Sequence, residues 1–225
     1  RRLLFGAVAT GGLIILLALI YMGPDMGSTI MNNSAGKGWH PCERFITQFR
    51  VIVLYMTLLI WPNPARLNVD YDFSLSKGLF SPPSTFLSLV LLAVIIAFAI
   101  TRFRKNPLIS FALLWFFVNL AIESSFLPLD LVYEHRLYLP SMGPIMLFAG
   151  WICSIKKPAL KKAGISLAIV FMVVLACWTR QRNVVWKGPV TLWEDNVRKS
   201  PKRARVYGNL GKAYLDKGKY EKARL

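Results

Sequence analysis

The sequence predicts an all-α membrane protein: a polytopic helical bundle of about five spanning helices and one re-entrant or interfacial helix, followed by the start of a helical repeat array. Of its 225 residues, 55% are hydrophobic, and the mean hydropathy is +0.45. The apolar residues form long blocks instead of amphipathic spacing, which excludes an ordinary soluble domain. Basic clusters lie between the blocks, and a repeat-like pattern occupies the last residues.

Five apolar blocks, helped by flanking residues, are long enough to cross about 30 Å of hydrocarbon. They are residues 3–22, 85–101, 108–122, 138–155 and 164–178. A sixth block, residues 45–61, contains Gln48 and Arg50 and runs into two prolines. An arginine at the bilayer centre costs about 2.5–3.5 kcal/mol. We therefore expect this block to be re-entrant or to lie at the membrane surface.

The charges fit five crossings better than six. One side receives basic residues without acids: Arg1, Arg2, Arg102, Arg104, Lys105, Lys156, Lys157, Lys161 and Lys162. The other side receives the mixed loops 23–84 and 123–137 and the tail from Thr179 onward. The positive-inside rule assigns the first side to the cytoplasm. Topology thus explains much of the net charge of +17, and no nucleic-acid partner is expected.

The tail carries a repeat signature. From Ala204 it reads ARVYGNLGKAYLDKGKYEKARL, whose Tyr, Leu, Gly and Ala positions match the start of a tetratricopeptide repeat (TPR). We expect residues 179–203 to form a linker and a capping helix, and residues 204–225 to form a first, truncated TPR. Because each repeat is stabilised by its neighbours, we expect more repeats to follow and treat the chain as a fragment.

The stretch YEHRLYLPS, residues 133–141, is the candidate binding site. It places Glu134, His135, Arg136 and Tyr138 just before a predicted membrane helix that begins near Leu137. A helix start offers unpaired N–H groups and the positive end of the helix dipole, so this stretch could hold an anion. The alternative is an interfacial anchor, with the tyrosines in the headgroup layer and Glu134 pairing Arg136.

Two further polar groups lie on the same side of the membrane. Asp70 and Asp72 are two residues apart, so in an extended segment both side chains would point the same way and form a possible polar site. Acids in loops beside Asn and Ser are more often turn or cap formers. Arg44 and Arg50 could bind a phosphate or pair with these acids, or anchor the chain at the interface.

Several enzyme classes are excluded by the motifs. The sequence has no Gly-rich phosphate loop, nucleophile elbow, HExxH or paired-Cys motif. The three cysteines and two histidines are scattered, so no metal site is predicted.

Three patterns together resemble a known family. The run ERFITQFRVIVLYMTLLIWPNPARLNVDYDF, the run YEHRLYLPSMG, and a last membrane helix that leads through LWE into TPRs are similar to bacterial multi-pass TPR proteins. They are also similar to the related eukaryotic transmembrane and TPR-containing O-mannosyltransferases, which are glycosyltransferases of the GT-C class. The likeness covers about two-thirds of the chain. It implies that residues 1–178 are the C-terminal part of a GT-C-like transmembrane domain.

The resemblance implies a glycosyltransferase that moves a sugar from a polyprenyl-phosphate carrier to a protein on the non-cytoplasmic side. No other cofactor is expected, and the TPR region would hold the protein acceptor. In that family the catalytic acid lies in the first outer loop, near the N-terminus, a part that we expect to precede the residues of this chain, so the catalytic residues are unknown. The family's pattern maps onto Glu134, Leu137, Tyr138, Leu139 and Pro140. Relatives carry Arg directly after the Glu, whereas this chain has His135 there and Arg136 one place later.

Two locations and two functions follow. The chain is expected in a bacterial inner membrane with a periplasmic tail or, as the alternative, in the endoplasmic reticulum membrane with a lumenal tail. The alternative function is a non-catalytic membrane-anchored TPR scaffold in an envelope complex.

Overall fold

The computed structural model describes residues 26–121, 123–125 and 127–224 and is helical there, as predicted. The predicted span 3–22 lies outside the described residues, as do position 122, which ends another span, and position 225, which ends the predicted repeat. The helices are, in order, α2 (Met26–Ala35), α3 (Pro41–Ile60), α4 (Ser84–Arg102), α5 (Pro107–Ala121), η1 (Glu134–Leu137), α6 (Met142–Ser154), α7 (Pro158–Val185), α8 (Pro189–Lys199), α9 (Ala204–Leu215) and η2 (Tyr220–Ala223).

Two of these helices, α4 and α7, are long and apolar enough to cross a membrane. The helices α5 and α6 are apolar but shorter, with 15 and 13 residues. The five-span bundle predicted from the sequence is therefore not confirmed. In α7 the candidate span is not buried inside the molecule, so its apolar side chains are open to an apolar solvent or to further protein.

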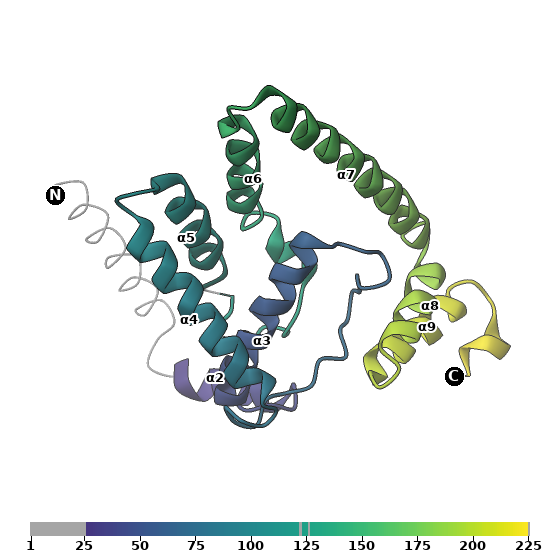
Figure 1. The fold of residues 1–225 in the computed structure, drawn as a ribbon. Coiled ribbons are helices and arrows are strands. Elements are labelled where there is room, and N and C mark those ends of the chain that lie inside the picture. Colours follow the sequence, from purple (N-terminus) through teal and green to yellow (C-terminus); the bar gives the residue numbers. More distant parts are fainter. Residues whose placement is uncertain (1–25, 122, 126, 225) are drawn as a thin grey trace.

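The helices occupy an upper and a lower part of the view in Figure 1. The pair α6–α7 rises to the top of the view, while α2, α3, α8 and α9 lie in its lower part. A core joins α3 to α5 and to the segment before α6, because Val51 and Tyr55 of α3 pack with Phe116 of α5 and with Leu131 and Leu137. The segment 61–83 leaves α3 and passes beside α8 before α4 begins.

The start of α3 has a complete local cap. The His40 side chain accepts the Cys42 N–H, and the Glu43 carboxylate accepts the His40 N–H at 3.0 Å. Pro41 occupies the first turn, where its missing N–H costs nothing. This capping box explains why the helix begins four residues before the predicted block 45–61.

The predicted helix start near Leu137 is wrong. Residues 134–137 form a 3-10 helix, and α6 begins at Met142. The reason is tertiary: the Tyr55 hydroxyl bonds the N–H and the carbonyl of Tyr133, and the Trp115 indole N–H donates to the Leu139 carbonyl. The Trp115 bond occupies the Leu139 carbonyl, which a helix begun at Leu137 would use within itself, and the Tyr55 bonds hold the chain at Tyr133.

The C-terminal helices form their own small core. Val190 of α8 packs with Leu210, Ala213 and Tyr214 of α9. The chain turns after α9 at Gly218, whose φ of +68° favours glycine. A helix and a turn thus stand where the repeat pattern predicts them, while the assignment of that pattern to a TPR stays a prediction. Unlike the expected boundary at Thr179, α7 continues to Val185.

The contact between α5 and α6 generates a prediction. A Cβ added to Gly143 of α6 would collide with the backbone of Ala112 in α5. We expect Gly143→Ala to destabilise the fold by about 1–3 kcal/mol, because two backbones must separate. The midpoint of thermal unfolding in detergent measures it.

The matched control is Gly208→Ala in α9, where an added Cβ meets nothing within 4 Å. It should leave the midpoint unchanged or raise it, since alanine favours a helix over glycine by about 1 kcal/mol. Equal midpoints for Gly143→Ala and the wild type would contradict the close packing of α5 and α6.

Candidate functional site

A buried arginine near the start of α3 fixes the segment that follows α5. Arg44 is fully buried and donates to the main-chain carbonyls of Glu123, Ser125 and Leu129. Its Nε lies 2.9 Å from the Leu129 oxygen, and one Nη lies 2.8 Å from that of Glu123. The sequence predicts Arg44 as a phosphate ligand, but burial and these three bonds give it a structural role.

Arg136, the central residue of the predicted site, is also buried. Its residue surface is 9% exposed, and its Nε lies 2.6 Å from a carboxylate oxygen of Glu123. One Nη donates to the Asp130 carbonyl at 2.9 Å, and the guanidinium carbon lies 5.2 Å from the centre of the Tyr133 ring. The acid that orients Arg136 is therefore Glu123, and the prediction that Glu134 does so is wrong.

Glu134 faces the segment 61–83 instead. Its carboxylate accepts the Tyr71 hydroxyl at 2.8 Å and the backbone N–H of Asn68. Burial and the neighbouring Glu134 carboxylate raise the pKa of Tyr71 well above its usual range, so the phenol stays a hydrogen-bond donor. Glu134 thereby fastens the candidate site to the loop that precedes α4.

Asp130 connects more parts of the molecule than the other acids of the site. One carboxylate oxygen lies 3.1 Å from the Lys37 ammonium; the other accepts the Tyr133 hydroxyl at 2.6 Å and lies 3.3 Å from Arg205 of α9. Burial acts to raise the pKa of Asp130, but the bonds from Tyr133 and Lys37 and the charge of Arg205 outweigh it and lower the pKa to about 2. Asp130 thus joins α9 to the neighbourhood of Arg136.

The two acids of the predicted polar site have different environments. Asp70 is 4% exposed and pairs with Arg205 at 2.7 Å and with Arg203 at 3.4 Å. Asp72 is exposed, and its backbone N–H donates to the Ser200 hydroxyl. The expectation that both carboxylates point the same way to form one site is not met. The hydrogen bond and the charge of Asp70 raise the pKa of Arg205, so the guanidinium keeps its charge.

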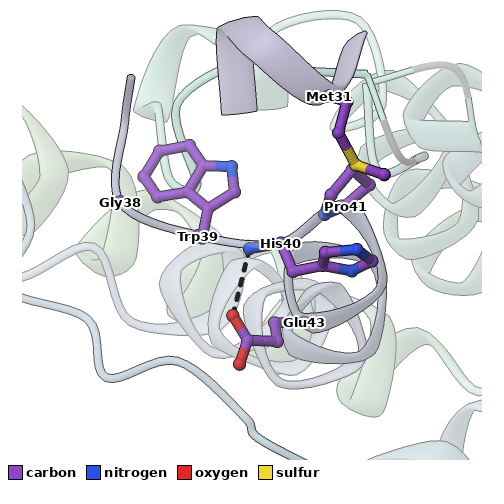
Figure 2. Close-up of a pocket in the computed structure, with 6 residues that line it drawn as sticks. All are labelled: Met31, Gly38, Trp39, His40, Pro41 and Glu43. Atoms are coloured by element: carbon purple, nitrogen blue, oxygen red, sulfur yellow. Dashed lines mark hydrogen bonds between the residues drawn. The ribbon is translucent and has the colours of Figure 1, made fainter. Parts of the chain in front are cut away.

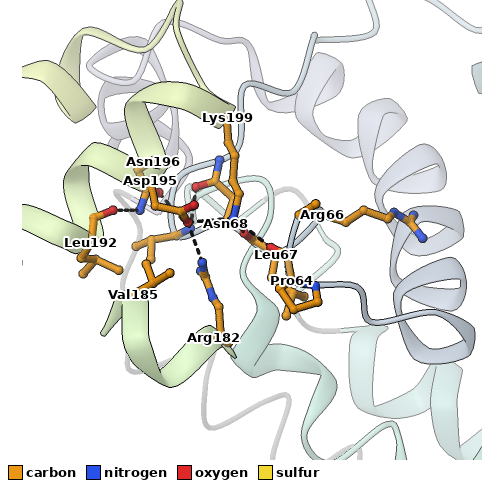
Figure 3. Close-up of polar contacts among 12 residues, drawn as sticks. Pro64, Arg66, Leu67, Asn68, Arg182, Val185, Leu192, Asp195, Asn196 and Lys199 are labelled. Carbon is orange, nitrogen blue, oxygen red and sulfur yellow. Dashed lines mark hydrogen bonds and ion pairs between the residues drawn. The ribbon is translucent and has the colours of Figure 1, made fainter. Parts of the chain in front are cut away.

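The C-terminal end of α8 binds the main chain of the segment 61–83 (Figure 3). The Lys199 ammonium donates to the carbonyls of Pro64 and Leu67, each at 2.8 Å. The Asn196 side chain accepts the N–H groups of Val69 and Asp70. The helical tail is therefore docked on this loop through backbone groups as well as through ion pairs.

Two residues of the predicted site reach the surface. His135 is exposed beside Tyr133, with ring centres 5.0 Å apart, and Tyr138 is 78% exposed. Arg50 lies elsewhere, because its guanidinium donates to the Ser74 carbonyl at 3.0 Å and lies against the Phe73 ring. The site therefore presents an imidazole and a phenol at the surface, while the guanidinium of Arg136 is buried.

A hollow of about 340 Å³ beside the start of α3 does not add a second chemical site (Figure 2). It is lined by Met31, Gly38, Trp39, His40, Pro41 and Glu43. Its two titratable side chains, those of His40 and Glu43, are engaged in the helix cap. Within the described ranges no three His, Cys, Asp or Glu side chains come close enough together to hold a metal ion.

Three residues of this network were missed by sequence reasoning. Glu123, Asp130 and Arg205 carry no local motif, and Arg205 is 75 positions from Asp130. The signal available in the sequence is modest: Asp130 precedes Tyr133 by three residues. The other pairings depend on how α5, the 3-10 helix and α9 meet in space.

The chain is similar in sequence to known proteins. Protein O-mannosyl-transferase Tmtc3 of Drosophila melanogaster is 30% identical over 230 residues, which cover 95% of this chain and 24% of the relative. The chain is a distant relative of the protein O-mannosyl-transferases. TMTC3 of Mus musculus is 35% identical over 102 residues, and TMTC4 of Homo sapiens is 33% identical over 90 residues. No family model and no solved structure matches the chain.

The resemblance to the O-mannosyltransferases seen in the residue patterns is thereby confirmed at a distant level. The chain spans 24% of the Drosophila relative, 11% of the mouse relative and 12% of the human relative. These three relatives are animal proteins, and the bacterial side of the resemblance stays a prediction. Because the chain covers only this part of each relative, the similarity alone does not assign the relatives' activity to it.

The network around Asp130 generates a prediction on acid stability. Its pKa in the folded protein is about 2, below the ordinary 3.8. Its contribution to stability is therefore complete above pH 4 and is lost as the pH falls from about 4 to 2. We expect the midpoint of thermal unfolding to fall over this interval, and Asp130→Asn to reduce that fall.

The control for this experiment is Asp72→Asn, which changes an exposed carboxylate of the same face. It should keep the wild-type dependence on pH. A curve for Asp130→Asn that is as steep as that of the wild type would show that the ion pairs of Asp130 do not stabilise the fold.

Proposed function

We propose that this chain is part of a membrane glycosyltransferase that moves a sugar from a polyprenyl-phosphate carrier to a protein on the non-cytoplasmic side. The observation that carries the proposal is the similarity to a protein O-mannosyl-transferase along 95% of the chain. The names of the relatives point to mannose as the sugar. The geometry contributes a polar surface, residues 133–141, directly before an apolar helix.

The proposal includes five crossings, with residues 3–22 as the first and α4, α5, α6 and α7 as the others. Exposed apolar side chains support it. The side chains of Val94 in α4, Ile145 and Trp151 in α6 and Val170 in α7 are 59–63% exposed. Lipid is the solvent that such faces require. The loops 23–84 and 123–137 and the tail would then share the non-cytoplasmic side, in a bacterial inner membrane or in the endoplasmic reticulum.

The proposed donor site is the exposed face of residues 133–141. A phosphate leaving group gains negative charge as the sugar bond breaks, and fixed donors stabilise that charge. His135 and Tyr138 would contact the phosphate, and Arg136 would supply positive charge from behind. Glu123 neutralises Arg136 and is 40% exposed, so it can move away when a phosphate competes for the guanidinium.

The chemistry assigns binding, and not proton transfer, to these residues. The sugar leaves the phosphate oxygen and joins a hydroxyl of the acceptor protein, whose proton passes to a general base. By the resemblance, that base belongs to the family's first outer loop, and no residue of this chain is assigned to it. The acceptor would reach the site along the helical repeats that begin at α9, which Asp70 and Lys199 hold against the segment 61–83.

A second candidate function is a non-catalytic membrane scaffold whose repeats recruit partners. One observation favours it: the cations Arg44, Arg136 and Arg205 all have partners inside the molecule. In the scaffold these pairs would serve stability alone.

Glycosyl transfer by single variants of the full-length protein tests the donor site. His135→Ala removes an exposed imidazole, so we expect normal assembly with transfer reduced about tenfold or more. Arg136→Lys keeps the charge but loses the planar fork that binds phosphate, so transfer should also fall. Transfer from a lipid-linked sugar to a peptide, measured in proteoliposomes, gives the rates.

Leu79→Ala is the matched control, because Leu79 is 40% exposed, lies outside residues 133–141 and contributes no polar side chain. It should retain both the assembly and the rate of the wild type. Wild-type transfer by His135→Ala and Arg136→Lys would overturn the donor site and favour the scaffold.

Accessibility of single cysteines tests the proposed membrane sides. Cys42, at the start of α3, is exposed and would lie on the non-cytoplasmic side, and Arg104→Cys, between α4 and α5, would lie in the cytoplasm. With the other cysteines replaced by serine, an impermeant maleimide added from outside should label Cys42 and spare position 104. Labelling of both positions from one side would contradict the crossing by α4.

A further inference from the structure

A cavity of about 150 Å³ lies between α7 and the start of the segment 61–83. It is lined by Pro62, Leu67, Leu175, Trp178, Thr179, Arg182 and Asn183. The α7 members recur at intervals of three and four residues, so they share one face of the helix. On the same measure a single water requires about 10–15 Å³, so this space admits something larger.

Arg182 is the buried cation among the residues that line this cavity. The residue is 8% exposed, and one Nη lies 2.7 Å from a carboxylate oxygen of Asp195. The other Nη is buried and has no hydrogen-bond partner among the described residues. A buried guanidinium donor without an acceptor is costly, so an oxygen acceptor is expected to enter through the space that Arg182 lines.

The local charge is positive. The Asp195 oxygen that pairs with Arg182 also lies 2.7 Å from the Lys199 ammonium, so two cations share one carboxylate (Figure 3). Lys199 is further engaged with the carbonyls of Pro64 and Leu67. One positive charge of Arg182 and Lys199 is therefore not balanced by Asp195. This excess charge beside the cavity favours an anionic oxygen over a neutral one.

The cavity also stands at a change of polarity. The apolar run of α7 ends at Cys177, and polar residues begin at Thr179. Between them, Trp178 packs edge-to-face on Trp61, with ring centres 4.8 Å apart. Tryptophans are enriched where a membrane meets water, at the depth of lipid phosphates.

We propose that this cavity binds the phosphate group of a bilayer phospholipid, with Arg182 as its cationic ligand. The exposed Thr179 and Asn183 contribute polar groups at the rim, and Trp178 and Leu175 contact the apolar part of the lipid. The site is separate from the proposed donor site at residues 133–141. It rests on the proposed membrane placement of α7 and not on glycosyl transfer.

Native mass spectrometry of the full-length protein in detergent tests the proposal. The probes are phosphatidylglycerol, a polyprenyl monophosphate and inorganic phosphate, each titrated separately. Thr179→Trp fills the cavity from an exposed position and leaves the Arg182–Asp195 pair intact. We expect phosphatidylglycerol to be retained by the wild type and to bind about tenfold or more weakly to Thr179→Trp and to Arg182→Gln.

The matched control is Cys177→Trp, which adds the same side chain at an exposed neighbour outside the cavity lining. It should retain the lipid as the wild type does. Equal retention by Thr179→Trp would overturn the site and leave water as the occupant. Tighter binding of the polyprenyl monophosphate, lost in Thr179→Trp, would overturn the phospholipid as its source, and binding of inorganic phosphate alone would overturn a lipid ligand.

The outcome is independent of the transferase assay. Arg182→Gln also alters an ion pair, so its thermal unfolding is measured alongside and Thr179→Trp carries the decision. Loss of transfer in His135→Ala with normal lipid retention would support both proposals separately. Wild-type transfer in that variant would overturn the donor site alone.

Discussion

The buried guanidinium of Arg44 is the interaction on which the polar half of the molecule depends. It holds the carbonyls of the segment 123–129, and this segment supplies Glu123 to Arg136 and leads directly into Asp130. A buried cation needs every donor satisfied, so the loop conforms to the arginine. The geometry of the candidate donor site is therefore set in α3, a helix that contributes no exposed side chain to that site.

The sequence predicted the positions of the helices better than the contacts between residues far apart in the chain. Apolar blocks predicted α4, α5 and α7 because such runs have a single stable form in an apolar surrounding. The start of α6 was misplaced, since the bond from Trp115 to the Leu139 carbonyl and the bonds from Tyr55 that hold Tyr133 come from residues more than 20 positions away. Periodicity carries no information about contacts of that range.

The same limit explains the misassigned acids. Glu134 and Arg136 are close in sequence, but a 3-10 helix has three residues per turn, so their side chains leave on different sides. Glu134 meets Tyr71, while Arg136 meets Glu123. Asp70 and Asp72 separate likewise, because Arg205 of α9 draws in Asp70. The sequence did predict that residues 133–141 come before an apolar helix, whereas their role as a binding site stays a prediction.

The docking of α8 on the segment 61–83 has a geometric consequence. Lys199 and Asn196 bind main-chain groups of the segment 61–83. The direction in which α8 and α9 leave the membrane-facing part is therefore set by these bonds and not by a flexible linker. A polypeptide carried along such a tail would meet the membrane surface at a constant height. The choice among the hydroxyl groups of the acceptor would then depend on how many residues separate each hydroxyl from the part of the acceptor bound to the tail, and not on the neighbouring side chains.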